Sequence, residues 1–385
     1  MVVAIDGSNI RAGGGITHLM ECLSVLSPEQ FGIERVYLYG GDELLSAVGN
    51  FVWLEKCSPH GLRGGGGRRY LWRQFHLNGM VSSNADVLLV PGGSYSGGFR
   101  PFVALAQNVL PFDVVAKALE GLTAKRLRLQ ILSRIQRKTF RRASGLIYMS
   151  AISKRHIELE TNFEHPQSRV IYHGTRPSFF EATRDRISDF GYSAGRPFRL
   201  LYVSTLEPYK HQSTVVQAVV RLNAIGIPVH LDLVGPGDKG DCTNLAREIS
   251  RSDPERRYIR YHGPLPYSEL SAIYLKGDAF VFASSCETFG IILLEAMASG
   301  LPLICSNRSA MPEVVGDAGL YFDPLSVDSL VRSIRCVWEN PSVRRSLVFR
   351  GRTKACEYSW ARCASQTFGF IRDVHVLHGN AKTKK

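Results

Sequence analysis

Residues 283–302 read ASSCETFGIILLEAMASGLP, and they carry the clearest structural signal in the chain. An apolar run leads into this stretch, and a second apolar run lies inside it between Glu287 and Glu295. Short apolar runs bounded by glycine or proline are typical of strands buried on both faces, as in parallel sheets. We therefore predict a strand over residues 279–283, a loop through Glu287 and a buried helix over residues 291–298.

The same alternation of short apolar runs and helical patterns extends in both directions. It predicts further strands over residues 2–5, 35–39, 52–55, 87–90, 102–105, 145–149, 170–172, 199–203, 229–234, 258–261 and 303–306, and helices over 214–225, 243–249 and 267–275. A turn-rich stretch, residues 188–197, interrupts the pattern. We predict an α/β fold with two Rossmann-like, doubly wound domains, residues 1–190 and 191–360, which face a cleft, and a C-terminal segment over residues 361–385.

The composition is that of a globular protein, since 44% of the 385 residues are hydrophobic and 21% are charged. No apolar run approaches the roughly 20 residues that a membrane-spanning helix requires. No secretory signal follows Met1, so a cytoplasmic protein is expected. The eight cysteines include no Cys-x-x-Cys pair, and we therefore expect neither a metal site nor a disulfide framework.

Positive charge is concentrated in one region of the first domain. Lys and Arg exceed Asp and Glu by 13 over the whole chain, and residues 56–155 hold 17 basic and 3 acidic residues. Four arginines (Arg63, Arg68, Arg69 and Arg73) surround a run of four glycines, residues 64–67. Nucleic acid is not an expected partner, because no nucleic-acid-binding motif accompanies the charge.

The other basic segment, residues 117–142, has a helical pattern. A face of Leu119, Leu122, Leu129, Leu132 and Ile135 is expected to pack on the domain. The basic residues between them, which include Arg134, Arg137 and Arg141, are expected to contact an anionic membrane surface or an acceptor that carries phosphate. An ordinary solvated helix packed by its leucines is the alternative, and both interpretations can hold together.

Two loops are suited to hold an anion. Glycines 13–15 precede a helix after the first strand, where the backbone amides of Gly14 and Gly15 can approach a phosphate. Lys210 precedes a helix in the second domain and can place a cation beside a diphosphate. A tight turn and a surface lysine are the alternatives. The chain has no Gly-Lys-Ser or Gly-Lys-Thr sequence, which argues against a nucleoside triphosphatase with a Walker motif.

The two glutamates of the opening stretch are candidate ligands of hydroxyl groups. Glu287 follows a strand, and Glu295 lies in a helix apolar enough to be buried. A buried carboxylate requires hydrogen-bond donors, and sugar or ribose hydroxyls are suitable ones. An ion pair between Glu295 and a nearby Arg or Lys is the alternative.

Taken together, Lys210, the Glu287-x7-Glu295 element and the runs at residues 295–302 and 311–319 resemble the retaining glycosyltransferases of family 4. The resemblance implies a GT-B fold in which the C-terminal domain holds the nucleotide and the last helix, after Trp360, returns to the first domain. It also implies that Lys210 contacts the diphosphate, Glu287 the donor sugar, Glu295 the ribose, and the backbone around Thr288, Phe289 and Gly290 the sugar and phosphate.

The chain also departs from this family. Tyr209 stands where many relatives have a second basic residue, so Arg11, Arg176 or helix dipoles are expected to help neutralise the diphosphate. Gln107 and Asn108 replace a common His-Asp pair, and we consider His173 as the catalytic substitute. A structural role for His173 is the alternative.

These observations predict a retaining hexosyltransferase that uses a nucleoside diphosphate sugar and a glycan or lipid-linked acceptor in bacterial surface polysaccharide biosynthesis, including lipopolysaccharide. No cofactor is expected, and the absence of Asp-x-Asp favours a metal-independent reaction. Peripheral contact with the inner membrane face is also expected. A sugar-nucleotide epimerase or phosphorylase of the same fold, and a non-catalytic basic binding module, are the alternatives.

Overall fold

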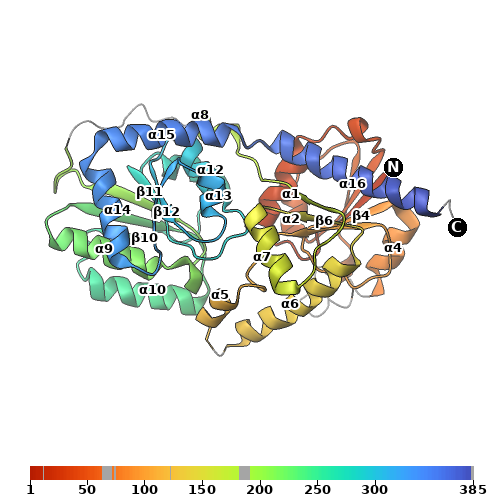
Figure 1. Cartoon of the computed structure of the whole chain (residues 1–385), viewed down its shortest axis with the longest axis horizontal. Coiled ribbons are helices and arrows are strands. Elements are labelled where there is room, and N and C mark those ends of the chain that lie inside the picture. The colour runs from red at the N-terminus through yellow and green to blue at the C-terminus, as the bar shows by residue number, and fades with distance from the viewer. Residues whose placement is uncertain (12, 63–71, 73–74, 122, 182–190, 383–385) are drawn as a thin grey trace. The chain divides into compact units, whose positions relative to one another are not determined.

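The computed structural model describes residues 1–382 except 12, 63–71, 73–74, 122 and 182–190 (Figure 1). The chain folds as two compact units, which we call unit 1 (residues 1–117, 121–174 and 359–385) and unit 2 (residues 118–120 and 175–358). The predicted cluster of Arg63, Arg68, Arg69 and Arg73 around glycines 64–67 lies outside the described residues.

The chain passes from unit 1 to unit 2 at residues 174–175, which differs from the predicted boundary at 190–191. The reason is the short helix α8 (Pro177–Glu181), which packs on α12 (Ile291–Ala298) of unit 2. Phe179 of α8 is buried there with its ring edge-on to that of Tyr274. The chain returns to unit 1 at residues 358–359, close to the predicted boundary at 360–361.

Unit 1 contains a seven-stranded parallel sheet in the order β3-β2-β1-β4-β5-β6-β7. The strands are β1 (Val2–Asp6), β2 (Arg35–Tyr39), β3 (Leu54–Cys57), β4 (Val87–Val90), β5 (Phe102–Ala106), β6 (Gly145–Tyr148) and β7 (Ser168–Val170). Every residue of β4, β5 and β6 is buried, because helices cover both faces of a sheet of this kind. The predicted strands are confirmed, with β3 and β7 each shifted by two residues.

The described helices of unit 1 are α1 (Gly14–Ser24), α2 (Asp42–Ala47), α4 (Leu77–Asn84), α5 (Val114–Leu119), α6 (Ala124–Arg142), α7 (Ala151–Thr161) and α16 (Trp360–Lys382), with short 3-10 turns at Pro28–Phe31 and His60–Leu62. The last helix, α16, packs against α1 and against β4, β5 and β6 (Figure 1). The expected return of the last helix to the first domain is therefore confirmed.

The packing predicted for the basic segment is partly wrong. It forms two helices, α5 and α6. Leu122 lies outside the described residues, and of the other members of the expected leucine face only Leu129 is buried. The buried face of α6 instead carries Ser133, Gln136, Thr139 and Phe140. Thr139 accepts a hydrogen bond from the Tyr95 amide and donates one to the Tyr95 carbonyl, and Ser133 accepts one from Arg137. The buried face is therefore more polar than the pattern of leucines indicates.

Unit 2 contains a six-stranded parallel sheet in the order β10-β9-β8-β11-β12-β13. The strands are β8 (Phe198–Val203), β9 (Val229–Val234), β10 (Ile259–Tyr261), β11 (Ala279–Phe282), β12 (Leu303–Ser306) and β13 (Gly319–Phe322). The helices, besides α8 and α12, are α9 (Gln212–Ala224), α10 (Lys239–Ser252), α11 (Tyr267–Tyr274), α13 (Met311–Val315), α14 (Val327–Glu339) and α15 (Pro341–Cys356). Five of these strands are predicted from the sequence, and β13 is not.

Candidate active site

The strand order of unit 2 reverses between two neighbouring strands, β8 and β11. From β8 the chain proceeds to β9 and β10 on one side, and from β11 to β12 and β13 on the other. The loops that follow β8 and β11 therefore diverge at the carboxyl edge of the sheet, which is where open parallel sheets bind their ligands. Lys210 follows β8 and Glu287 follows β11, so both candidates lie at this reversal.

Lys210 ends a 3-10 turn, Pro208–Lys210, and only 7% of the residue is exposed. Its Nζ lies 5.2 Å from the ring centroids of both Tyr209 and Phe282. Aromatic faces attract a cation and keep water away from it. The hydroxyl of Tyr202 donates a hydrogen bond to the carbonyl oxygen of Lys210. The alternative of a surface lysine is therefore wrong.

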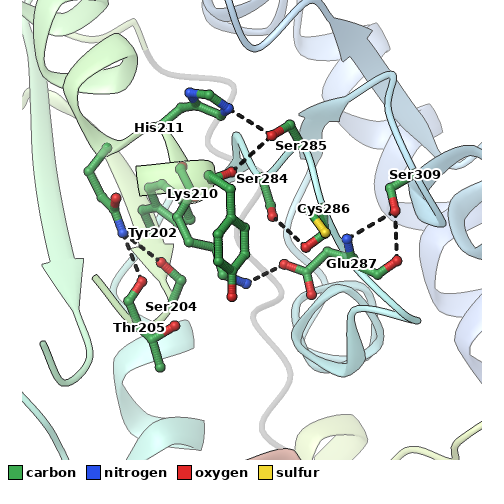
Figure 2. Close-up of polar contacts among 12 residues, drawn as sticks. Tyr202, Ser204, Thr205, Lys210, His211, Ser284, Ser285, Cys286, Glu287 and Ser309 are labelled. Atoms are coloured by element: carbon green, nitrogen blue, oxygen red, sulfur yellow. Dashed lines mark hydrogen bonds and ion pairs between the residues drawn. The ribbon is translucent and has the colours of Figure 1, made fainter. Parts of the chain in front are cut away.

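The ammonium group of Lys210 forms an ion pair with Oε1 of Glu287 (Figure 2). The two side chains are predicted to bind different parts of the donor, and their contact with each other is not predicted from the sequence. Both groups retain capacity, because an ammonium group has three protons and a carboxylate has two oxygens. Within the described part of the chain, Glu287 Oε2 accepts no hydrogen bond.

Backbone contacts fix the two loops around this ion pair (Figure 2). The amide of Glu287 donates to Ser309 Oγ at 2.9 Å, and Ser309 Oγ donates to the Glu287 carbonyl at 2.6 Å. The Ser285 amide donates to the Tyr209 carbonyl at 2.9 Å, and Nε2 of His211 lies 2.9 Å from Ser285 Oγ. Sequence reasoning missed these serines, and no local pattern distinguishes them from other loop serines.

Burial also sets the protonation of the groups around the ion pair. It raises the pKa of Tyr202 and of Tyr209, and the nearby carboxylate of Glu287 raises both further. Both hydroxyls therefore stay protonated at physiological pH. Burial lowers the pKa of His211, so this imidazole is neutral. The two tyrosine hydroxyls and the imidazole around the ion pair are thus uncharged.

The neutral state of His211 predicts a pH dependence of stability. Below the usual histidine pKa of about 6.5 the unfolded chain binds a proton that the folded chain binds only at lower pH. The free energy of unfolding should therefore fall as the pH drops below about 6.5, by at most about 1.4 kcal/mol per pH unit for one proton. Of the charges near His211, Asp323 opposes the lowered pKa and Arg308 reinforces it.

Urea unfolding of the wild type and of His211→Gln at pH 7.5 and 5.5 tests this dependence. Burial also lowers the pKa of His173 and His230, so the informative quantity is the difference between the two proteins. The variant should lose less stability on acidification than the wild type. Equal losses would show that His211 does not contribute.

The residues that follow Glu287 begin helix α12. Gly290 is its N-cap with φ 86°, and a Cβ added there would lie 2.9 Å from Leu293 Cδ1, so this position favours glycine. Phe289 is buried with its ring edge-on to that of Tyr358, while Thr288 is half-buried. The predicted donor-binding residues Thr288, Phe289 and Gly290 therefore form one short loop beside Glu287, at the positive end of a helix dipole.

Glu295 is 2% exposed in the middle of α12. The hydroxyl of Tyr267 donates to its Oε1 at 2.9 Å, and that of Tyr274 donates to its Oε2 at 3.0 Å. The predicted burial and need for donors are confirmed, and these two donors are tyrosine hydroxyls. Contact with a ribose stays a prediction. Arg176, considered above as a partner of the diphosphate, lies with its guanidinium carbon 4.3 Å from the ring centroid of Tyr267.

The remaining candidates lie in unit 1. Gly14 and Gly15 begin α1 after β1, where the strand order of unit 1 also reverses between β1 and β4. A Cβ on Gly15 would lie 3.2 Å from Ile10 Cγ2, so a larger residue would crowd this turn. Nδ1 of His173 lies 3.1 Å from Nδ1 of His18. The roles of Gly14, Gly15 and His173 stay predictions.

Two of the three predicted surface arginines have contacts within unit 1. Arg137 donates to Ser133 Oγ at 3.4 Å, and Arg141 donates to the Thr161 carbonyl at 3.2 Å. Arg134 has an exposed side chain. We found no helix among the described residues with enough consecutive apolar length to cross a bilayer.

Two doubly wound parallel α/β units, with a lysine–glutamate pair at the strand reversal of the second, define a fold of the GT-B class. Residues 184–354 match the family model of the glycosyl transferases group 1. The chain therefore carries a domain of the glycosyl transferases group 1 family, as the sequence motifs indicated.

Three known proteins illustrate the similarity. The O-antigen chain mannosyltransferase B of Escherichia coli is 35% identical over 167 residues, which span 43% of this chain and 44% of that protein. The chain therefore matches less than half the length of this curated relative. The solved sucrose-phosphate synthase from Thermosynechococcus elongatus has a TM-score of 0.77 at 15% identity, covering 98% of this chain and 100% of that one. The structure of WaaG, a glycosyltransferase involved in lipopolysaccharide biosynthesis, has a TM-score of 0.71 at 17% identity, covering 96% and 99%.

Proposed function

We propose that this protein is a retaining glycosyltransferase that moves a hexose from a nucleoside diphosphate sugar to a hydroxyl group of a glycan or lipid-linked acceptor. The observation that carries the proposal is the ion pair between buried Lys210 and half-buried Glu287 at the strand reversal of unit 2. The pair offers a cation for a diphosphate and a carboxylate oxygen for sugar hydroxyls within one small site.

The main chemical task is to stabilise the departing diphosphate. As the glycosidic bond breaks, negative charge grows on the phosphate oxygen that leaves the sugar. The remaining protons of the Lys210 ammonium group and the amides at the start of α12 can donate hydrogen bonds to this charge. Tyr209, Phe282 and neutral Tyr202 exclude water around Lys210, which strengthens the interaction.

Glu287 positions the sugar in this proposal. Its Oε1 is held by Lys210, and its Oε2 accepts hydrogen bonds from hydroxyl groups of the hexose. The departing phosphate oxygen takes the proton of the acceptor hydroxyl, which attacks from the same face, so the anomeric configuration is retained. We propose that Lys210 and backbone amides do the electrostatic work without a metal ion.

A product assay with a panel of UDP and GDP sugars tests the proposal. The expected result is release of the nucleoside diphosphate together with a new glycoside whose anomeric configuration, read by NMR, is that of the donor. Because the Escherichia coli relative is named an O-antigen mannosyltransferase, a mannose donor and a bacterial surface polysaccharide are the first to test. An isomerised nucleotide sugar formed without acceptor would identify an epimerase instead. A protein that neither turns over nor binds any of these sugars would be a binding module.

We further propose that the acceptor is carried on a lipid and that α6 contacts the anionic inner face of the membrane. Leu127 is 58% exposed and Ile131 is 48% exposed. They share one line of the helix with the exposed side chains of Arg134 and Lys138. Exposed apolar residues combined with basic residues are typical of helices that lie in a lipid interface.

Replacing Leu127 and Ile131 by Gln and Arg134 by Glu should abolish sedimentation with liposomes that contain anionic lipid. Each basic residue near such a surface contributes about 1 kcal/mol, and the two apolar side chains add their burial. Lys276→Glu, an exposed charge reversal in unit 2, is the control and should sediment like the wild type. If the wild type stays in the supernatant, or the triple variant still sediments, α6 is not a membrane contact.

A further inference from the structure

Three side chains with soft metal-ligating atoms meet in the interior of unit 1. His18 and Cys22 lie one helical turn apart on α1, and Cys363 lies on α16, which packs against α1 (Figure 1). Each residue is 1–2% exposed. One ligand atom from each of them lies within 4.8 Å of the other two. Among the described residues, no other set of His, Cys, Asp and Glu gathers in this way.

The spacing of these atoms fits a tetrahedral ion. Zinc binds sulfur at about 2.3 Å and imidazole nitrogen at about 2.0 Å. Tetrahedral angles then place two sulfurs about 3.8 Å apart and a sulfur and a nitrogen about 3.6 Å apart. Here Cys22 Sγ and Cys363 Sγ are 3.6 Å apart, and Cys22 Sγ and His18 Nε2 are 4.0 Å apart. These two separations lie within a few tenths of an ångström of the tetrahedral values, and all three donor atoms lie within 4.8 Å of one another.

We propose that unit 1 binds a zinc ion through His18 Nε2, Cys22 Sγ and Cys363 Sγ. Thiolate and imidazole donors without a carboxylate favour zinc over magnesium or calcium, which prefer oxygen ligands. The sequence predicts no metal site, because its cysteines include no Cys-x-x-Cys pair. That reasoning missed this set because Cys22 and Cys363 are 341 residues apart.

The neighbours of His18 also suit a metal ligand. Its second ring nitrogen, Nδ1, lies 3.1 Å from Nδ1 of His173. A hydrogen bond at the second nitrogen is what fixes the tautomer and ring orientation of metal-bound histidines. Trp360 packs against both rings, with centroids 6.0 Å from His18 and 5.6 Å from His173. The cluster supplies three of the four ligands that a tetrahedral zinc ion takes, so a water is the fourth ligand in this proposal.

The ion would stabilise unit 1 by joining two helices from distant parts of the chain. α1 begins at the glycine turn of the first strand, and α16 follows the last crossing from unit 2. A cross-link between residues this far apart removes much of the freedom of the unfolded chain. The role that we propose for this ion is therefore to stabilise the fold of unit 1.

Zinc content and cobalt substitution of the full chain test the proposal. Protein purified under reducing conditions without chelators should contain about one zinc per chain by mass spectrometry. A strong chelator should lower the melting temperature of the wild type by about 5 °C or more. Replacement of zinc by Co²⁺ should produce a thiolate-to-cobalt charge-transfer band. Cys22→Ser and Cys363→Ser should lose the zinc, and Cys363→Ser should lose most of the band.

Cys305→Ser is the matched control, because Cys305 is equally buried but lies in β12 of unit 2. It should keep its zinc even if it is less stable. The chelator experiment uses the wild type, so the proposal can be tested even if a cluster variant does not fold. Three outcomes would overturn it: wild-type protein free of zinc and without a cobalt band, a Cys22–Cys363 disulfide in the reduced preparation, or equal loss of zinc in Cys305→Ser.

Discussion

Replacing Lys210 by methionine should lower the turnover number for sugar transfer by about 100-fold or more. Methionine keeps much of the side-chain volume beside Tyr209 and Phe282 but removes the ammonium group that donates to the departing diphosphate. The measurement is release of nucleoside diphosphate at saturating donor and acceptor. Lys276→Met, which removes an exposed lysine of unit 2, should keep wild-type turnover.

The ion pair complicates this experiment, since Lys210→Met leaves the carboxylate of Glu287 without its partner. An unpaired buried charge is strongly destabilising, whereas removal of both charges is often neutral. The double variant Lys210→Met/Glu287→Gln should therefore be close to the wild type in melting temperature and still inactive. Wild-type turnover in Lys210→Met would contradict the proposed reaction. Recovery of activity in the double variant would mean that the pair is only structural.

Replacing Gly174 by alanine should reduce the free energy of unfolding of unit 1 by about 3 kcal/mol. A Cβ at this position would lie 2.1 Å from the amide nitrogen of Trp360 and 2.4 Å from the carbonyl carbon of Ser359. Both are backbone atoms, so no side chain can rotate away to make room. Denaturant unfolding, followed by the fluorescence of buried Trp360, measures the loss.

Gly79→Ala is the matched control for this substitution. Gly79 lies in α4, and a Cβ there would meet no atom within 4 Å. Alanine in a helix is favoured over glycine by up to about 1 kcal/mol, so this variant should be equal to or more stable than the wild type. If both variants unfold like the wild type, the close approach of Gly174 to the start of α16 does not limit stability.

The sequence predicts most of the sheet because buried parallel strands are continuous apolar runs. β2, β9 and β12, together with helix α12, have the predicted ends. β13 (Gly319–Phe322) was missed although Leu320, Tyr321 and Phe322 are apolar or aromatic; the run is only three residues long, and three of the four strand residues are half-buried. The face of α6 was assigned partly incorrectly because leucine content alone does not reveal which side of a helix is buried, and here a polar side chain, Thr139, finds its partner in the backbone of Tyr95.

The candidate site could be predicted residue by residue but not as an arrangement. Lys210 and Glu287 stand out as charges at the ends of predicted strands. Their contact depends on β8 lying beside β11, which is a property of strand order. Ser309 and Ser285 carry no local signal, because their partners are backbone groups of other loops. The contact between Cys22 and Cys363 could not be predicted for the same reason, because it joins residues 341 apart in the sequence.

The return of α16 to unit 1 has a consequence for biosynthesis. Unit 2 consists almost wholly of the continuous stretch 175–358, whereas unit 1 is assembled from segments on both sides of it. The ribosome releases the chain from its N-terminus. Unit 2 can therefore complete its sheet before residues 359–382, which pack on the sheet of unit 1, have been synthesised. We expect the nascent chain to depend on chaperones during that interval, and the later unit in sequence to mature first.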